Sequence, residues 1–221
     1  MGALPMWVRR RQLTLGLAIF FVVWYSLQLS ISHVFGEEVA RWWFDFEHPP
    51  ELISAGIIFA PLSHDVNTLT HITGNFLLLF TAGGVAEPHI GKERILVLVI
   101  GLGYLSIYLA NVTVTVHHNW MLAGASGGVL ALWAYAGLRM RHHAAEYLSD
   151  GVTWSRRSVE AVGSVVLLLG IPAFFFHQLV WIDQPHSGHI IGLILGVVYY
   201  IGEPYLNHIK IDISKHTQYR Q

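Results

Sequence analysis

The stretch that decides the fold is residues 121–138, MLAGASGGVLALWAYAGL. It contains no charged residue, and its one serine, Ser126, lies among glycines as Gly124-Ala125-Ser126-Gly127-Gly128. A helix needs roughly 20 apolar residues to cross the hydrocarbon core of a bilayer. Met121–Leu138 is therefore predicted to be a short membrane-spanning helix. A reactive side chain inside such a helix is a candidate for function.

The composition of the whole chain agrees with a membrane domain. Of its 221 residues, 53% are hydrophobic and 12% are charged, whereas soluble domains carry roughly 25% charged residues. The chain has no cysteine, which excludes disulfides, thiolate metal sites and cysteine nucleophiles. The formal net charge of −1 gives no basic surface for nucleic acid, so no nucleic-acid partner is expected.

Six apolar blocks are long enough to span, and they predict an all-α membrane protein with a six-helix bundle. The second, fourth and sixth blocks are short, which is typical of helices surrounded by protein instead of lipid. The six blocks are Leu13–Val34, Leu69–Ala86, Ile95–Val116, Met121–Leu138, Val159–Trp181 and Ser187–Ile201.

The positive residues predict the orientation of these spans. With six crossings, twelve of the thirteen Lys and Arg residues fall on one side, and only Arg41 falls on the other. Positive charge favours the cytoplasmic side, so both termini are expected there. We expect a cytoplasmic segment at 1–12, one membrane domain at 13–204 and a cytoplasmic tail at 205–221. The chain has no organelle-targeting signal, which favours a prokaryotic plasma membrane.

The long loop at 35–68, between the first two spans, is rich in aromatic residues. It contains Trp42, Trp43, Phe44 and Phe46, followed by the break Pro49-Pro50. Aromatic side chains favour the headgroup zone, so an amphipathic segment in the outer interface is predicted. The alternative is a plain extracytoplasmic loop.

The polar residues of three spans converge at one depth. His71 and Asn75 begin the second span, Ser126 lies early in the fourth, and His189 opens the sixth. All three spans enter from the same predicted side, and a helix rises about 1.5 Å per residue. The four side chains therefore lie about one or two helical turns below the outer surface.

Small residues make close packing of the fourth and sixth spans possible. Gly188, Gly192 and Gly196 recur every four residues, and Gly124 and Gly128 flank the serine with the same spacing. Such ridges let membrane helices pack backbone to backbone, which would bring a serine hydroxyl to an imidazole. The alternative is that these glycines serve packing alone.

Those residue types predict nucleophilic catalysis. A serine hydroxyl attacks a carbonyl only after a base takes its proton, and His189 is the candidate base for Ser126. The oxyanion that forms needs donors, for which Asn75, His71 one turn earlier and the backbone N–H of Ser126 are candidates. No Asp or Glu lies early in these three spans, so a Ser–His dyad is expected, without metal or cofactor.

Four motifs in order resemble those of the rhomboid intramembrane serine proteases. Gly124-Ala125-Ser126-Gly127 is similar to their GxSG nucleophile motif. His189-x-x-Gly192-x-x-x-Gly196 is similar to their histidine and glycine ridge, and His71-x-x-x-Asn75 to their oxyanion motif. Gly83-Gly84-Val85-Ala86-Glu87 looks like the end of their second span. The resemblance implies the rhomboid bundle and cleavage of transmembrane protein substrates near their extracytoplasmic ends.

The chain also departs from that pattern. Many relatives have an aromatic residue four positions after the nucleophile, where this chain has Leu130, so His189 is expected to be held less firmly. His64 lies seven residues before His71, where relatives often have a histidine at five. His186 could compete for the base role, but the glycine spacing favours His189.

Several other functions compete with proteolysis. The main alternative is a rhomboid-like protein that is weakly active or inactive and binds membrane clients. A transporter would need a polar path through the membrane, and the inner halves of the second, fourth and sixth spans are almost wholly apolar. Gly124-x-Ser126-x-Gly128 also fits the α/β-hydrolase pattern, but it lacks that fold's strand–turn–helix context. The outer-side histidines, including His117 and His118, are a weak candidate for a metal site.

Overall fold

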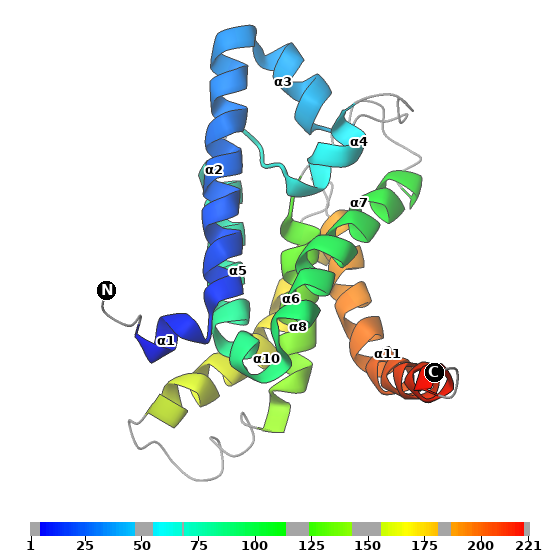
Figure 1. The fold of residues 1–221 in the computed structure, drawn as a ribbon. Coiled ribbons are helices and arrows are strands. Elements are labelled where there is room, and N and C mark those ends of the chain that lie inside the picture. The colour runs from blue at the N-terminus through cyan, green and yellow to red at the C-terminus, as the bar shows by residue number, and fades with distance from the viewer. Residues whose placement is uncertain are drawn as a thin grey trace.

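The computed structural model describes residues 5–46, 55–67, 69–113, 124–142, 156–180 and 187–218, and within these ranges it contains helices and no β-strand (Figure 1). The elements up to the third long helix are α1 (Met6–Arg9), α2 (Gln12–Phe35), α3 (Glu37–Phe44), α4 (Gly56–Phe59), η1 (Ala60–Leu62), α5 (Leu69–Ile90), α6 (Lys92–Leu96), η2 (Val97–Gly101) and α7 (Leu102–Thr113). The remaining elements are α8 (Ser126–Arg139), α10 (Arg156–Val180) and α11 (Ser187–Gln218). The predicted all-α class is confirmed.

Three stretches are long and apolar enough to cross a membrane, judged by length and composition over the described residues. They are Gln12–Phe35, Leu69–Ile90 and Lys92–Val112, which cover the first three predicted spans. The other three predicted spans coincide with α8, α10 and α11. Residues 114–116, 121–123 and Trp181, at the ends of predicted spans, lie outside the described residues. The number of membrane crossings stays a prediction.

Helix α8 forms the centre of the bundle. Every residue from Ser126 to Gly137 is buried, and α5, α7, α10 and α11 all contact it. A helix that is apolar on all sides is stable when protein surrounds it. This burial agrees with the prediction made from the shortness of the fourth span.

Two glycines on α11 explain how it approaches α8 so closely. A Cβ atom at Gly192 would lie 2.8 Å from the Cα and carbonyl carbon of Gly127, and one at Gly196 would lie 2.9 Å from the same atoms of Ala131. Ordinary contacts between carbon atoms are about 3.5–4.0 Å, so no side chain fits at either position. Gly188 differs, because the nearest atom to its added Cβ would be 3.9 Å away. Of the three glycines in the predicted ridge, the close approach of α11 to α8 therefore requires Gly192 and Gly196 but not Gly188.

Glu87, near the end of α5, fixes the start of α2. Its carboxylate accepts hydrogen bonds from the backbone N–H groups of Leu13 and Thr14, at 2.9 and 2.8 Å, and from the Thr14 hydroxyl at 2.7 Å. The first N–H groups of a helix have no partner within the helix, and the positive end of the helix dipole favours an anion there. A carboxylate from one helix thus caps the next.

The aromatic segment after α2 forms the amphipathic helix α3, at the end of α2 opposite α1 (Figure 1). Phe44 and Phe46 are buried, whereas Trp42 and Trp43 are 46% and 40% exposed. The Trp43 ring lies against Phe59 of α4, with ring centroids 6.1 Å apart. The placement of this segment in the membrane interface stays a prediction, and Pro49-Pro50 lies outside the described residues.

Helix α11 is longer than the predicted sixth span, which ends at Ile201. It continues as one helix to Gln218, with Pro204 inside it. Figure 1 shows its final part, in red, at a sharp angle to its first part. A proline inside a helix removes one backbone hydrogen bond and bends the helix axis. Pro204 therefore explains why α11 changes direction but continues as one helix. The residues from 205 to 218, assigned to the expected tail, are therefore helical.

Candidate active site

Ser126 is the first residue of α8, and a turn at Gly124 places it there. Gly124 has a φ of +136°, which side chains other than glycine rarely adopt. Its backbone N–H donates a hydrogen bond of 2.9 Å to the carbonyl oxygen of Ala60 in η1. The backbone N–H of Ser126 belongs to the first turn of α8, where no helical carbonyl is available to it. The hydroxyl of Ser126, the candidate nucleophile, and a backbone donor therefore lie together.

His189 lies directly against this serine. Its Nε2 atom is 2.9 Å from the Ser126 Oγ atom, within ordinary hydrogen-bond distance. The histidine is the third residue of α11, one turn before Gly192, so the glycine contact between α8 and α11 also brings the two side chains together. Ser126 is 7% exposed and His189 is half-buried. This arrangement gives the hydroxyl a base to receive its proton.

The His189 ring also packs against an aromatic residue that the sequence patterns did not single out as its neighbour. The ring of Phe174, on α10, lies 6.1 Å from the ring of His189 and 5.7 Å from the ring of Trp133. Leu130, at the position where many relatives have an aromatic residue, is fully buried. The expectation that Leu130 leaves His189 loosely held overlooked this contact. The signal was present in the aromatic run 174–176, but its register on α10 could not be read from spacing.

His71 points its distal nitrogen at the nucleophile turn. Its Nδ1 atom accepts a hydrogen bond of 3.3 Å from the backbone N–H of Asp65. In the neutral ring the proton is then on Nε2. A Cβ atom at Gly124 would lie 2.9 Å from the Nε2 and Cε1 atoms of His71 and 3.2 Å from the Ser126 Oγ atom. A donor N–H therefore faces the space beside the serine.

Asn75 lies one turn along α5 from His71. It is 3% exposed, and its Nδ2 atom is buried without a hydrogen-bond partner among the described residues. A buried donor left unpaired costs roughly 1–3 kcal/mol, and such a cost at a site is commonly associated with function. Its amide group is available to a ligand atom that carries negative charge.

His64 is a buried neighbour of this group that the sequence reasoning did not place. It is 1% exposed, its ring lies 5.5 Å from the ring of His71, and both its ring nitrogens lack partners in the described part of the chain. Gln28 of α2 holds its backbone, because the Gln28 side chain bonds both the N–H and the carbonyl of His64, at 3.1 and 3.3 Å. Burial, with a smaller effect of His71, lowers the pKa of His64 to about 3. A neutral imidazole is therefore built into the wall behind His71.

The remaining predicted residues are placed as follows. Gly127 packs on Ser106, and an added Cβ there would also lie 3.2 Å from the carbonyl oxygen of Gly188. His117, His118 and His186 lie outside the described residues. Within the described residues no group of three or more His, Asp or Glu side chains is arranged to hold a metal ion.

The comparison with known families identifies the bundle. The family model for the Rhomboid domain matches residues 54–203, and the chain therefore belongs to the rhomboid family. The match includes Ser126, His189, His71 and Asn75. Together with its apolar helices, this makes the chain an integral membrane protein of a family whose members are generally serine intramembrane proteases. No curated protein matches the chain significantly.

Proposed function

We propose that this chain is an intramembrane serine endopeptidase that cleaves transmembrane protein substrates through a Ser126–His189 dyad. The observation that carries the proposal is the 2.9 Å contact between the Ser126 Oγ and His189 Nε2 atoms at the start of the buried helix α8. It is supported by membership of a family that is generally proteolytic. A bundle that only bound clients would have no need of a base aligned with a hydroxyl.

The reaction begins at the serine. The Ser126 Oγ atom attacks the carbonyl carbon of the scissile peptide while His189 Nε2 takes its proton. The protonated His189 then donates that proton to the leaving amine, and an acyl-enzyme remains. Water, deprotonated by the same imidazole, hydrolyses the ester and regenerates the hydroxyl.

The negative oxygen of the tetrahedral intermediate needs donors that are already in place. The candidates are the Nε2–H of His71, whose tautomer the Asp65 backbone sets, the Nδ2–H₂ of Asn75 and the backbone N–H of Ser126. Each such donor contributes typically 10²–10³-fold in rate in water-excluding sites. An unpaired Asn75 amide in the unliganded protein fits a donor whose partner forms only during the reaction.

The site is proposed to act near the extracytoplasmic face. Ser126 and His189 both lie at the beginnings of their helices, and α3 and α4 lie at that end of the bundle (Figure 1). The positive-residue pattern predicts that this end faces outward. Substrate bonds near the outer ends of transmembrane segments would therefore reach the serine.

A fluorophosphonate probe tests the proposal. The wild-type protein in detergent should form a covalent adduct on Ser126, located by peptide mass spectrometry, and should cleave a reporter transmembrane substrate. Ser126→Ala should lose both, and His189→Ala should lower both by several orders of magnitude, because the base is gone. Ser106→Ala is the matched control: its buried hydroxyl donates to the Gly103 carbonyl at 2.8 Å and bonds no histidine in the described part of the chain, so labelling and cleavage should persist. A folded wild-type protein that neither labels nor cleaves would refute the protease and favour the client-binding alternative.

A further inference from the structure

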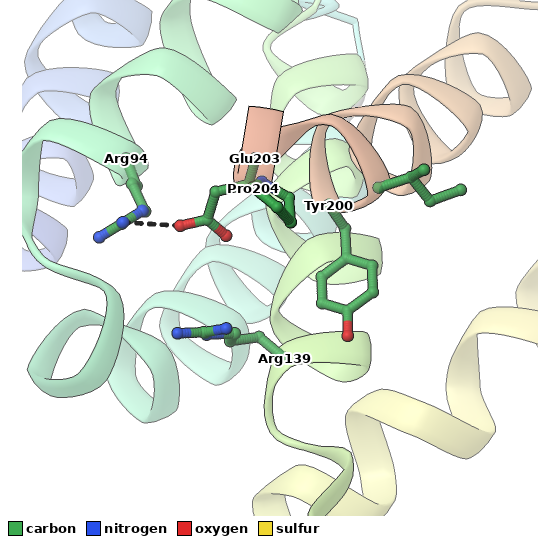
Figure 2. Close-up of a pocket in the computed structure, with 6 residues that line it drawn as sticks. Arg94, Arg139, Tyr200, Glu203 and Pro204 are labelled. Carbon is green, nitrogen blue, oxygen red and sulfur yellow. Dashed lines mark ion pairs between the residues drawn. The ribbon is translucent and has the colours of Figure 1, made fainter. Parts of the chain in front are cut away.

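A second polar cluster lies at the opposite end of the bundle from Ser126. It surrounds a pocket of about 370 Å³ lined by Arg94 of α6, Arg139 of α8, and Tyr200, Ile201, Glu203 and Pro204 of α11 (Figure 2). Pockets that bind small molecules commonly have volumes of about 300–1,000 Å³. We call this the Arg139 pocket. It is separate from the proposed protease site and does not depend on it.

The single acid of the pocket is already fully engaged. Glu203 is buried, accepts a hydrogen bond of 2.6 Å from the Tyr135 hydroxyl, and forms an ion pair of 2.6 Å with Arg94. Arg94 also donates to the Ile90 carbonyl at 2.8 Å. One positive and one negative charge thus cancel, and both are held by their neighbours.

Arg139 supplies a second positive charge to the pocket lining. It is exposed, and it forms no hydrogen bond or ion pair with any residue in the described part of the chain. Figure 2 shows its guanidinium group extending toward the same side of the pocket as that of Arg94. Five N–H donors on a planar cation suit a phosphate group, which accepts two parallel hydrogen bonds from arginine.

An apolar stripe leads from the pocket along α11. Ile194, Val198 and Ile201 are 49%, 57% and 61% exposed, and their spacing of four and three residues puts them on one face of the helix. Ile201 belongs to both the stripe and the pocket lining. One molecule could therefore place a phosphate group in the pocket and a hydrocarbon chain along the stripe.

We infer that the Arg139 pocket binds the phosphate headgroup of an anionic phospholipid, with an acyl chain along Ile194, Val198 and Ile201. Basic pockets between helices at the cytoplasmic membrane face suit anionic headgroups, and the positive residues predict that this end is cytoplasmic. The stripe selects a lipid over a free phosphate ester, because only a lipid would cover it.

Photolabelling in nanodiscs tests this assignment. The probe is phosphatidylglycerol with a diazirine in its acyl chain, diluted into phosphatidylcholine nanodiscs that contain the full-length protein. Labelling should concentrate on the α11 peptide that contains residues 194–201. Arg139→Gln should lower it about fivefold, because the headgroup phosphate loses its contact with the guanidinium group and a loss of about 1 kcal/mol corresponds to that factor. Arg139→Lys should retain only part of the labelling, because the charge remains but the two parallel hydrogen bonds to phosphate are lost.

The controls separate a specific site from general attraction. Arg10→Gln removes the same charge from an exposed arginine at the same predicted membrane face and should leave labelling unchanged. Unlabelled phosphatidylglycerol should compete, whereas millimolar glycerol 1-phosphate should not. Equal labelling of wild type and Arg139→Gln, an equal loss in Arg10→Gln, or competition by glycerol 1-phosphate would each overturn the lipid site. Thermal unfolding of each variant establishes that it is folded.

Discussion

Replacing Gly192 with alanine should separate the Ser126 and His189 side chains while leaving the protein folded. The added Cβ atom would lie 2.8 Å from the Cα and carbonyl carbon of Gly127, where contacts of about 3.5–4.0 Å are normal. Relieving this overlap requires α11 to move from α8 by roughly 1 Å. Gly127 follows Ser126 directly and His189 precedes Gly192 by one turn, so the same movement lengthens the 2.9 Å contact to about 4 Å.

The expected result is a large loss of activity with a moderate loss of stability. A displacement of 1 Å in a catalytic geometry costs on the order of 10²-fold in rate, and overpacking costs roughly 1–3 kcal/mol in unfolding free energy. Cleavage of a reporter substrate and thermal unfolding in the same detergent measure the two effects. Gly188→Ala is the matched control on the same helix, because its added Cβ would contact nothing closer than 3.9 Å. The reasoning would be refuted if Gly192→Ala cleaved the reporter at the wild-type rate, or if Gly188→Ala lost as much activity as Gly192→Ala.

Three further predictions concern buried polar groups. Glu87→Gln should lower the unfolding free energy by roughly 1.5–3 kcal/mol by weakening the cap on α2, measured by denaturant titration, whereas the exposed Glu93→Gln should change it little. His64 stays neutral in the folded protein at pH values above about 3, so acidification from pH 7 to pH 5 should cost about 2 kcal/mol of stability as the unfolded state gains its proton. The loss should be smaller by that amount in His64→Phe, and equal pH profiles for the two proteins would contradict the assignment. Asn75→Ala should lower turnover by roughly 10²-fold or less, because other donors remain, and an unchanged rate would remove it from the oxyanion site.

The sequence predicted the helices well where hydrophobicity alone determines them. The first three predicted spans agree with long apolar helices, and the shortness of the fourth correctly indicated a helix surrounded by protein. The same expectation did not hold for the second span, because α5 has 22 residues and only 33% of its apolar window is buried. The helical conformation of the residues after Pro204 was not anticipated, because they are polar and were assigned to a tail, yet α11 continues to Gln218. A proline bends a helix as readily as it ends one, and hydropathy does not distinguish the two.

The contacts around the candidate site were less accessible to sequence reasoning. Glycine spacing on two spans was enough to anticipate that Ser126 and His189 would meet, since small residues limit how helices can pack. The contact of Phe174 with His189 depends on the rotation of α10 about its axis. The contacts of Glu203 with Tyr135 and Arg94 depend on how the ends of three helices meet. Neither leaves a periodic signal along the chain. His64 was noted only for its spacing from His71, because burial of a loop histidine depends on the helix packed over it, here through Gln28.

The hydrogen bond between the Gly124 N–H and the Ala60 carbonyl gives the nucleophile a mechanical connection to the surface of the protein. Ala60 follows Phe59, and the Phe59 ring rests against the half-exposed indole of Trp43. Two residues beyond Gly124 stands the serine itself. If the aromatic segment lies in the membrane interface as predicted, we expect a force on that tryptophan from a change in bilayer thickness to reach the Ser126 hydroxyl through one ring contact and one peptide hydrogen bond. The proposed cleavage would then depend on the thickness of the host membrane as well as on the substrate.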